Sequence, residues 1–144
     1  MERIKYESNS IIYQESLMLR NRILRLPLGK DIFAEDLSIE RQNKFYGILV
    51  DNQLIATISA YDEVPYIAHV TAFAVEEAYQ KMGYGRLLLD FLVTDLAGSG
   101  FKRVNVDARA TAKVFYEKCG FIVVNGPIRN EHLEIDDYEM SILL

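Results

Sequence analysis

The spacing of apolar residues along the chain predicts a sheet built from short strands. Two apolar runs, Lys44–Val50 and Gln53–Tyr61, are rich in strand-forming residues and flank the turn dipeptide Asp51-Asn52. They are therefore expected to form a β-hairpin. A third apolar run, Tyr66–Val75, predicts a further strand. Shorter strands are expected at Ile4–Glu7, Arg103–Ala108, Phe121–Val124 and Tyr138–Leu143.

Helical spacing appears in other segments. Leucines recur along Arg86–Ala97 at the period of a helix, and Gly98 follows as a helix terminator. A helix should begin at Ser10, whose hydroxyl can cap it, and run to about Arg25, before Pro27. Short helices are expected at Glu35–Arg41, with Asp36 and Ser38 as caps, and at Thr111–Cys119, where Gly120 stops the helix. This order predicts an α/β fold with a mixed sheet and helices on both faces.

The strand expected at Tyr66–Val75 has two unlike faces. Strict alternation groups His69 with a mixed set of neighbours, namely Ile67, Thr71, Phe73 and Val75. The opposite face is apolar and mostly small, with Tyr66, Ala68, Val70, Ala72 and Ala74. An apolar face suits packing against helices, whereas a mixed face is typical of a strand that lines a cleft.

Composition excludes several classes of protein. The chain has 144 residues, 50% hydrophobic and 26% charged, with a net charge of −5. We expect one domain, residues 1–144. The single cysteine, Cys119, excludes an internal disulfide, no apolar run approaches the ~18 residues of a membrane span, and Met1–Lys5 does not resemble a signal peptide. A cytoplasmic protein with no membrane partner is expected. The acidic balance disfavours nucleic acid and leaves cationic small molecules open.

A glycine-bearing loop, Gln80–Arg86, separates the third strand from the leucine-rich helix. Gly83 and Gly85 allow successive backbone N–H groups to face one point, and the helix N-terminus adds partial positive charge. Lys81 and Arg86 add two full charges, so the loop suits a pyrophosphate. A tight turn without a ligand would use the same glycines, and the loop alone leaves both interpretations open.

Two common phosphate loops do not match this one. A Walker loop ends in Gly-Lys-Ser/Thr, and the chain has Gly85-Arg86-Leu87. A dinucleotide fingerprint needs a third glycine where Leu88 stands.

A second motif follows about thirty residues later. Residues 112–121 read Ala-x-x-Phe-Tyr-x-Lys-x-Gly-Phe, after the Gln-x-x-Gly-x-Gly pattern of Gln80–Gly85. The two motifs, in this order, resemble the GNAT superfamily of N-acetyltransferases, and small bacterial members in particular. The specific part of the resemblance runs from about Tyr66 to Phe121. It implies a mixed, mostly antiparallel sheet with a central splayed strand pair and helices on both faces.

The resemblance implies acetyl-CoA as cosubstrate, with no metal. The backbone of Phe73, Ala74 and Val75 would contact the pantetheine arm. The pyrophosphate would lie on Gln80, Lys81, Met82, Gly83, Tyr84, Gly85 and Arg86. Tyr116 would be the general acid that protonates the leaving thiolate, since a phenol of pKa ≈ 10 can protonate a thiolate of pKa ≈ 8–9. The alternative for Tyr116 is a core aromatic residue.

The sequence leaves the identity of the general base open. Members of the superfamily carry Glu or His at the position of His69, and an imidazole of pKa near 6.5 suits the task. The alternatives are a structural role for His69, a water chain, Glu63, and the C-terminal cluster of His132, Glu134 and Asp136. The two histidines lie far apart in the sequence, which makes a zinc site improbable.

Two residues depart from the family pattern. Arg109 stands where many relatives have Asn, and a guanidinium cannot accept a hydrogen bond. It could contact the cofactor 3′-phosphate, the substrate or solvent. Cys119 stands at a commonly aliphatic position, and a structural cysteine is favoured over acyl-cysteine chemistry.

The predicted reaction is direct attack of an amine on the thioester, with no covalent enzyme intermediate and an oxyanion contact from the backbone near Val75. The alternatives are a non-catalytic acyl-CoA sensor on the same fold and a nucleotide-binding regulator. The acceptor would be a small-molecule or peptide amine bound by residues 11–40 and 125–138, which are partly acidic and so suit a cation. The apolar strand Tyr138–Leu144 could pair with a second copy and form a homodimer.

Overall fold

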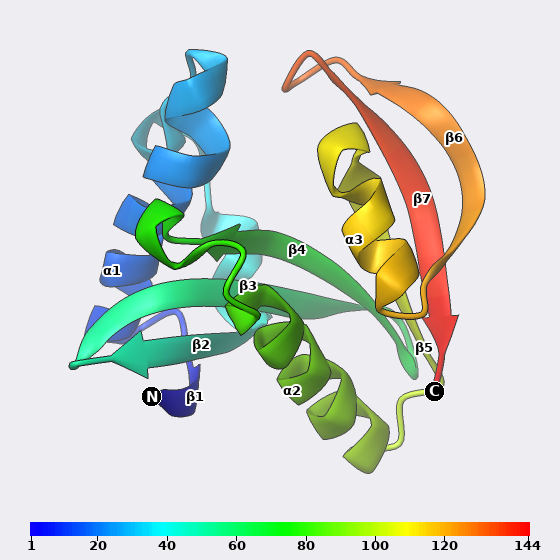
Figure 1. Ribbon diagram of the computed structural model, residues 1–144, viewed down its shortest axis with the longest axis horizontal. Helices are drawn as coiled ribbons and strands as arrows, with labels where there is room; N and C mark the ends of the chain where they lie inside the picture. The colour runs from blue at the N-terminus through cyan, green and yellow to red at the C-terminus, as the bar shows by residue number, and fades with distance from the viewer.

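The computed structural model describes residues 1–144 and contains a seven-stranded sheet (Figure 1). The strands are β1 (Glu2–Tyr6), β2 (Lys44–Val50), β3 (Gln53–Val64), β4 (Ile67–Val75), β5 (Arg103–Arg109), β6 (Ile122–Asn130) and β7 (Ile135–Leu143). Their order is β1-β2-β3-β4-β5-β7-β6, and only β4 and β5 run parallel. The prediction of a mixed, mostly antiparallel sheet is confirmed.

Three α-helices accompany the sheet: α1 (Ile11–Arg20), α2 (Tyr84–Gly98) and α3 (Lys113–Lys118). The Ser10 hydroxyl caps α1 as predicted, because it accepts a hydrogen bond from the Tyr13 N–H at 3.3 Å. None of the helices is long and apolar enough to cross a membrane.

The N-terminal helical segment is less regular than predicted. The α-helical geometry ends at Arg20 rather than Arg25, and Asn21–Arg25 forms a wider π turn in which the Leu26 N–H donates to the Asn21 carbonyl. A 3₁₀ turn then follows at Leu26–Leu28 and contains Pro27. The first turn of a helix tolerates proline because the N–H groups there have no partner within the helix, so the missing N–H costs nothing. The short helix predicted at Glu35–Arg41 is a 3₁₀ helix at Ser38–Gln42.

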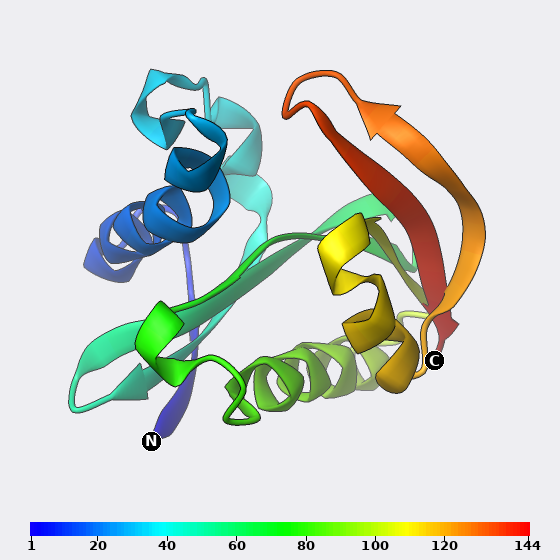
Figure 2. The same ribbon diagram turned by 45° about the horizontal axis from the view of Figure 1, so that its top comes forward.

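Helices cover both faces of the sheet, as predicted (Figure 2). On one face, four buried leucines of α2 and Tyr116 of α3 pack on the central strands and form the main core. On the other face, Tyr13 and Leu17 of α1 pack against Phe45, and Leu19 packs against Ala74. Along β5 and β7 the side chains that face the α1 side of the sheet are partly or fully exposed, apart from Ser141. The face of the C-terminal strands on that side therefore has no helical cover.

The parallel pair β4–β5 splays apart. Its register runs from Ile67 opposite Arg103 to Val70 opposite Val106 and then stops, although β5 continues to pair with β7 as far as Arg109. The second half of β4 consequently has no strand on its β5 side. The central splayed pair is thus present.

A bulge at Ala72 corrects the predicted faces of β4. Ala72 has a positive φ of 58°, and the β3–β4 register gains one residue between Thr71 and Ala74. Beyond the bulge the alternation reverses. Phe73 and Val75 therefore lie in the main core with Ala68 and Val70, whereas Ala74 packs on the α1 side. The prediction that Phe73 and Val75 share a face with His69 and Thr71 is wrong.

The C-terminal strands are longer than predicted and form a hairpin. β6 extends through Asn130 rather than ending at Val124, and Pro127 lies within it, which an edge strand tolerates because its outer groups need no partner. β7 lies between β5 and β6, so both of its edges are already paired. It cannot pair with a second copy, and the predicted route to a homodimer is wrong.

Candidate active site

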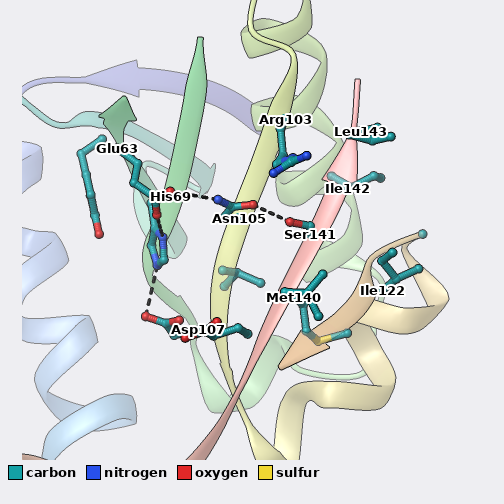
Figure 3. Close-up of a pocket in the computed structure, with 15 residues that line it drawn as sticks. Glu63, His69, Arg103, Asn105, Asp107, Ile122, Met140, Ser141, Ile142 and Leu143 are labelled. Atoms are coloured by element: carbon teal, nitrogen blue, oxygen red, sulfur yellow. Dashed lines mark hydrogen bonds and ion pairs between the residues drawn. The ribbon is translucent and has the colours of Figure 1, made fainter. Parts of the chain in front are cut away.

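A groove of about 820 Å³ lies along the uncovered face of the C-terminal strands. It is lined by side chains from β3 and β4 on one side and from β5, β7 and β6 on the other (Figure 3). His69 projects into it from β4, just before the point where β4 and β5 separate. The cleft that the mixed face of β4 predicted is therefore present on the His69 side.

Both ring nitrogens of His69 face carboxylates. Nδ1 lies 2.8 Å from Oε1 of Glu63, at the end of β3, and Nε2 lies 3.3 Å from Oδ2 of Asp107 on β5. The Tyr61 ring stacks on the imidazole at 5.2 Å between centroids. The side chain of His69 is 12% exposed, whereas those of Glu63 and Asp107 are 41% and 54% exposed. The imidazole is thus fixed in place while its two carboxylate partners remain open to solvent.

Asn105 holds Glu63 and is itself held by Ser141. Asn105 Nδ2 donates to Glu63 Oε2 at 3.0 Å, and Ser141 Oγ donates to Asn105 Oδ1 at 2.5 Å. The resulting chain, Ser141–Asn105–Glu63–His69–Asp107, crosses β7, β5, β3 and β4 (Figure 3). The structure contains no group of three or more His, Cys, Asp or Glu side chains arranged to hold a metal ion. The network is therefore one of hydrogen bonds and ion pairs.

The carboxylates set the protonation state of His69. Burial lowers the pKa of the imidazole, but the bonds to Asp107 and Glu63 outweigh burial, so the pKa lies above 6.5. The same contact with His69 holds the pKa of Asp107 below its usual range. The two carboxylates therefore favour the imidazolium form of His69, and the network has a net negative charge whether the imidazole is protonated or neutral.

Tyr116 lies on the opposite face of the sheet, within an aromatic cluster. Its ring is 4% exposed and makes edge contacts with Phe73, Phe115 and Phe121. Burial, followed by the neighbouring Cys119, raises the pKa of the phenol above 10, so it keeps its proton at neutral pH.

The Tyr116 hydroxyl makes no hydrogen bond to the protein, yet it is not among the fully buried unpartnered atoms, which are Arg20 Nε and Asp137 Oδ1. The hydroxyl is therefore reached by solvent. Tyr116 is both a core aromatic residue and a free donor, so the two interpretations made from the sequence are compatible.

The glycine-bearing loop lies beside this aromatic cluster. Gly83 caps α2 in the left-handed conformation, with φ of 90°, and Gly85 lies in the first turn of the helix, which begins at Tyr84 rather than Arg86. A Cβ on Gly85 would lie 3.5 Å from Phe73 and 3.7 Å from Phe115. The two sequence motifs therefore meet in space, the first at Gly85 and the second at Phe115.

The polar side chains of the loop are not equivalent. Gln80 Nε2 donates to the Val75 carbonyl at 2.9 Å, so this side chain ties the loop to the end of β4. Lys81, Met82 and Arg86 are exposed, and neither cation forms an ion pair. Two uncompensated positive charges thus flank the start of α2, as an anion site would require.

Arg109 spans the open end of the splayed pair. Its Nη2 donates to the Leu24 carbonyl at 3.0 Å and so joins the end of β5 to the π turn after α1. Burial, and then the proximity of Arg25, lower the pKa of the guanidinium. Arg109 therefore connects the end of β5 to the N-terminal helical segment.

The C-terminal cluster suggested by the sequence does not reach His69. His132 lies at the tip of the β6–β7 hairpin, 69% exposed and 4.0 Å from Glu35, and Asp136 pairs with Arg129. None of these residues lines the groove. Of the alternative bases, only Glu63 joins the His69 site.

Sequence reasoning missed Asn105, Asp107 and Ser141. A signal for the first two was present, because both are polar residues that alternate with valine or alanine in the strand predicted at Arg103–Ala108. That strand is the parallel neighbour of β4, and Asn105 lies opposite His69. Ser141 carried no such signal within its apolar terminal strand.

Comparisons with known proteins agree with this geometry. The model of the acetyltransferase (GNAT) domain family matches residues 28–142. An uncharacterized N-acetyltransferase of Oceanobacillus iheyensis is 31% identical over 137 residues, which cover 85% of this chain and 82% of the relative. Both the extent of the family match and this identity indicate a common family.

Solved structures share the fold. A structure from Lactobacillus plantarum, provisionally assigned as an N-acetyltransferase, superposes with a TM-score of 0.87 at 21% identity and covers 99% of this chain and 97% of its own. An aminoglycoside 6′-N-acetyltransferase in complex with coenzyme A gives a TM-score of 0.78 at 17% identity, over 99% and 97% of the two chains. Together with the matching family model, these findings show that the chain belongs to the GNAT family and is an N-acetyltransferase that uses acetyl-CoA.

Proposed function

We propose that the enzyme transfers an acetyl group from acetyl-CoA directly to an amine held on the His69 side of the sheet. The observation that carries this proposal is the end of the β4–β5 pairing at Val70 and Val106. The resulting gap is flanked by a proton donor, Tyr116, on one face and by a titratable network at His69 on the other. A thioester held in that gap would be open to attack from the groove while its sulfur faced the phenol.

The cofactor would lie along the free edge of β4. The backbone of Phe73, Ala74 and Val75 has no strand on its β5 side and would pair with the amides of the pantetheine arm. The pyrophosphate would lie on residues 80–86. Support for that placement comes from the unpaired Lys81 and Arg86, the left-handed Gly83 and the N-terminus of a 15-residue helix.

His69 would act as the general base together with its carboxylates. An alkylammonium is attracted by the net negative charge of the network, and its proton passes to the neutral form of the imidazole or to a water beside Asp107. The neutral amine then attacks the carbonyl carbon, the C–S bond breaks, and the nitrogen releases its second proton to solvent as the amide forms. The departing thiolate takes the Tyr116 proton, and the phenolate is reprotonated from solvent, so the acid and the base lie on opposite faces of the sheet.

We further propose that residues 1–144 act as one domain in the cytoplasm. The only cysteine, Cys119, is unpaired, as is usual for thiols in a reducing compartment.

Replacement of the phenol tests the proposal. Tyr116→Phe removes only the hydroxyl, and we expect turnover of acetyl-CoA with an amine panel to fall by roughly 10²-fold or more. Affinity for CoA, measured by calorimetry, should stay unchanged. Tyr138→Phe is the matched control, since it deletes a hydroxyl on the α3 side of β7, where Lys113 lies over the ring, and it should leave turnover intact.

Two results would contradict the proposal. Absence of CoA binding at hundreds of micromolar would overturn the cofactor site. Binding without turnover of any amine, together with no effect of Tyr116→Phe, would favour a non-catalytic acyl-CoA sensor.

A further inference from the structure

The groove has a size suited to a small molecule and a distinct chemical character at each end. Its volume of about 820 Å³ lies within the ~300–1,000 Å³ usual for small-molecule sites. The β5–β7 register orders its floor from Asp107, beside the splayed gap, through Asn105 to Arg103 at the far end. Four residues along a strand span about 13 Å, so a molecule that fills the groove is extended.

The end beside the gap carries unneutralised negative charge. Asp107 and Glu139 lie directly opposite one another in the β5–β7 ladder. Like charges in that position destabilise a sheet. Asp107 faces the imidazole, but Glu139 is exposed and forms no ion pair. A cation bound at this end would relieve the repulsion, and the end is adjacent to where the attacking nitrogen must lie.

The apolar side chains of the groove lie along its β6 side and, with Leu143, at the Arg103 end. Ile122, Val124 and Leu143 line the groove and are 65%, 58% and 73% exposed. Ile122 pairs with Ser141, which in turn lies opposite Asn105, two residues from Asp107. On the spacing of the sheet, Ile122 therefore lies about 8 Å from Glu139, one strand away, and about 12 Å from Asp107, two strands away. Exposed large apolar side chains gathered in one groove mark a surface that a ligand covers.

The guanidinium of Arg103 at the far end would repel a second positive charge in the ligand. Arg103 lines that end, and no carboxylate pairs with it. A polyamine that reached along the groove would bring its second ammonium toward this guanidinium. The arrangement suits a molecule with one positive charge beside Asp107 and an uncharged body.

We propose that the acceptor is a small primary amine carried on an apolar chain or ring, with its ammonium at Asp107 and Glu139 and its body on Ile122, Val124 and Leu143. The inference rests on the proposed function, because it takes the nitrogen at the Asp107 end as the group that receives the acetyl. It names the class of acceptor and the residues that select it.

Direct binding to the enzyme, with and without saturating CoA, tests the inference. The probes are hexylamine, the polar isostere 2-(2-aminoethoxy)ethanol and spermidine. Hexylamine should bind at least tenfold more tightly than either of the other two. Ile122→Ser should weaken hexylamine binding roughly fivefold to tenfold and leave the polar isostere unchanged. Ile11→Ser, the same change at an 86% exposed residue of α1 that does not line the groove, is the control and should change neither.

Several results would overturn the inference. They are equal affinity for hexylamine and its polar isostere, tighter binding of spermidine, and no effect of Ile122→Ser. A self-association that sedimentation detects in the wild type and that Ile122→Ser abolishes would show that a second copy covers the groove instead. Failure of the proposed function is distinguishable, because CoA binding and the Tyr116→Phe result do not involve Ile122.

Discussion

His69 is held at both ring nitrogens by carboxylates from two different strands, and this arrangement gives an ordinary strand histidine a defined chemistry. Ser141 holds Asn105, Asn105 holds Glu63, and Glu63 holds the imidazole. The raised pKa has two consequences. It makes the neutral imidazole a stronger base toward an ammonium, but it also means that the imidazole must first lose its own proton.

The pH dependence of kcat/KM follows from this state. If the neutral imidazole is the base, the rate should rise with pH through a pKa above 6.5, because the protonated form is inactive. Glu63→Gln removes one stabilising charge, so the pKa of His69 should fall and the rising limb should move to lower pH. The profile should be measured with two acceptors whose amines differ in pKa. A limb that belongs to His69 stays in place between them, whereas a limb that belongs to the substrate moves with the amine pKa.

In His69→Gln, the rise of kcat/KM with pH that is assigned to His69 should disappear. The rate should also fall by at least ~10²-fold. An enzyme limb that stays in place, or moves to higher pH, in Glu63→Gln would contradict a base role for His69.

At the scale of elements, the β4–loop–α2 unit combines two backbone irregularities. The bulge at Ala72 turns Phe73 into the aromatic cluster, and the left-handed Gly83 turns the chain into α2. Gly83 requires its positive φ, which other residues adopt only with strain. Gly85 does not, and the structure has room for a methyl group at that position because its nearest contacts would be 3.5 Å or longer. Packing within the protein therefore gives no reason for glycine at 85.

Gly85→Ala separates a binding role from a folding role. We expect an unchanged or slightly raised melting temperature, since alanine is favoured over glycine within a helix by about 1 kcal/mol. Affinity for CoA should fall at least tenfold, because the methyl group would occupy space where the pyrophosphate approaches the backbone.

Gly98→Ala, at the other end of α2 with no atom within 4 Å of the added Cβ, is the control and should leave CoA affinity unchanged. Wild-type affinity for CoA in Gly85→Ala would argue that the loop is only a turn.

At the scale of the whole molecule, a few long-range contacts hold the N-terminal helical layer in place. Arg20 of α1 makes two hydrogen bonds to Glu40, at 2.9 and 2.6 Å, and the Tyr13 hydroxyl donates to the same carboxylate. Arg20 and Glu40 are 3% and 8% exposed. Together with the Arg109 bridge to Leu24, this pair fixes the N-terminal helical layer against the sheet.

Glu40→Gln should lower the free energy of unfolding by about 3–5 kcal/mol, because it leaves the Arg20 charge buried and uncompensated. Burial raises the pKa of Glu40, but Arg20 and Tyr13 outweigh it and hold the pKa below 4.5. The stabilisation is therefore fully present above pH 4.5 and is lost as the pH falls through the folded pKa. Chemical denaturation at several pH values measures both effects.

The double variant Arg20→Leu/Glu40→Leu should recover most of the loss, since no unpaired charge remains. Asp62→Asn, which breaks the exposed pair with Lys44, should cost no more than about 1 kcal/mol. A Glu40→Gln loss no larger than that of Asp62→Asn would contradict the role given to the buried pair.

Much of the fold was predictable because its signals are local. The strand at Lys44–Val50, the cap at Ser10 and the left-handed Gly120 follow from residues within a few positions of each other. The helix predicted at Thr111–Cys119 also placed Tyr116 correctly, whereas Tyr84 and Gly85, predicted as loop, lie in the first turn of α2. The length of β6 was not predictable from Phe121–Val124, because Pro127 and Gly126 read as a turn when no partner strand is considered.

By itself, then, the sequence determined the order of elements, which depends on short-range patterns, and its two motifs indicated the class of chemistry through their resemblance to the GNAT family. Tertiary structure decided which face Phe73 occupies, that β7 has no free edge, and that Asp107, Asn105 and Glu63 surround His69. Strand pairing joins residues about forty positions apart, and one extra residue at Ala72 reverses every side chain beyond it. Neither effect leaves a mark on the local pattern of apolar and polar residues.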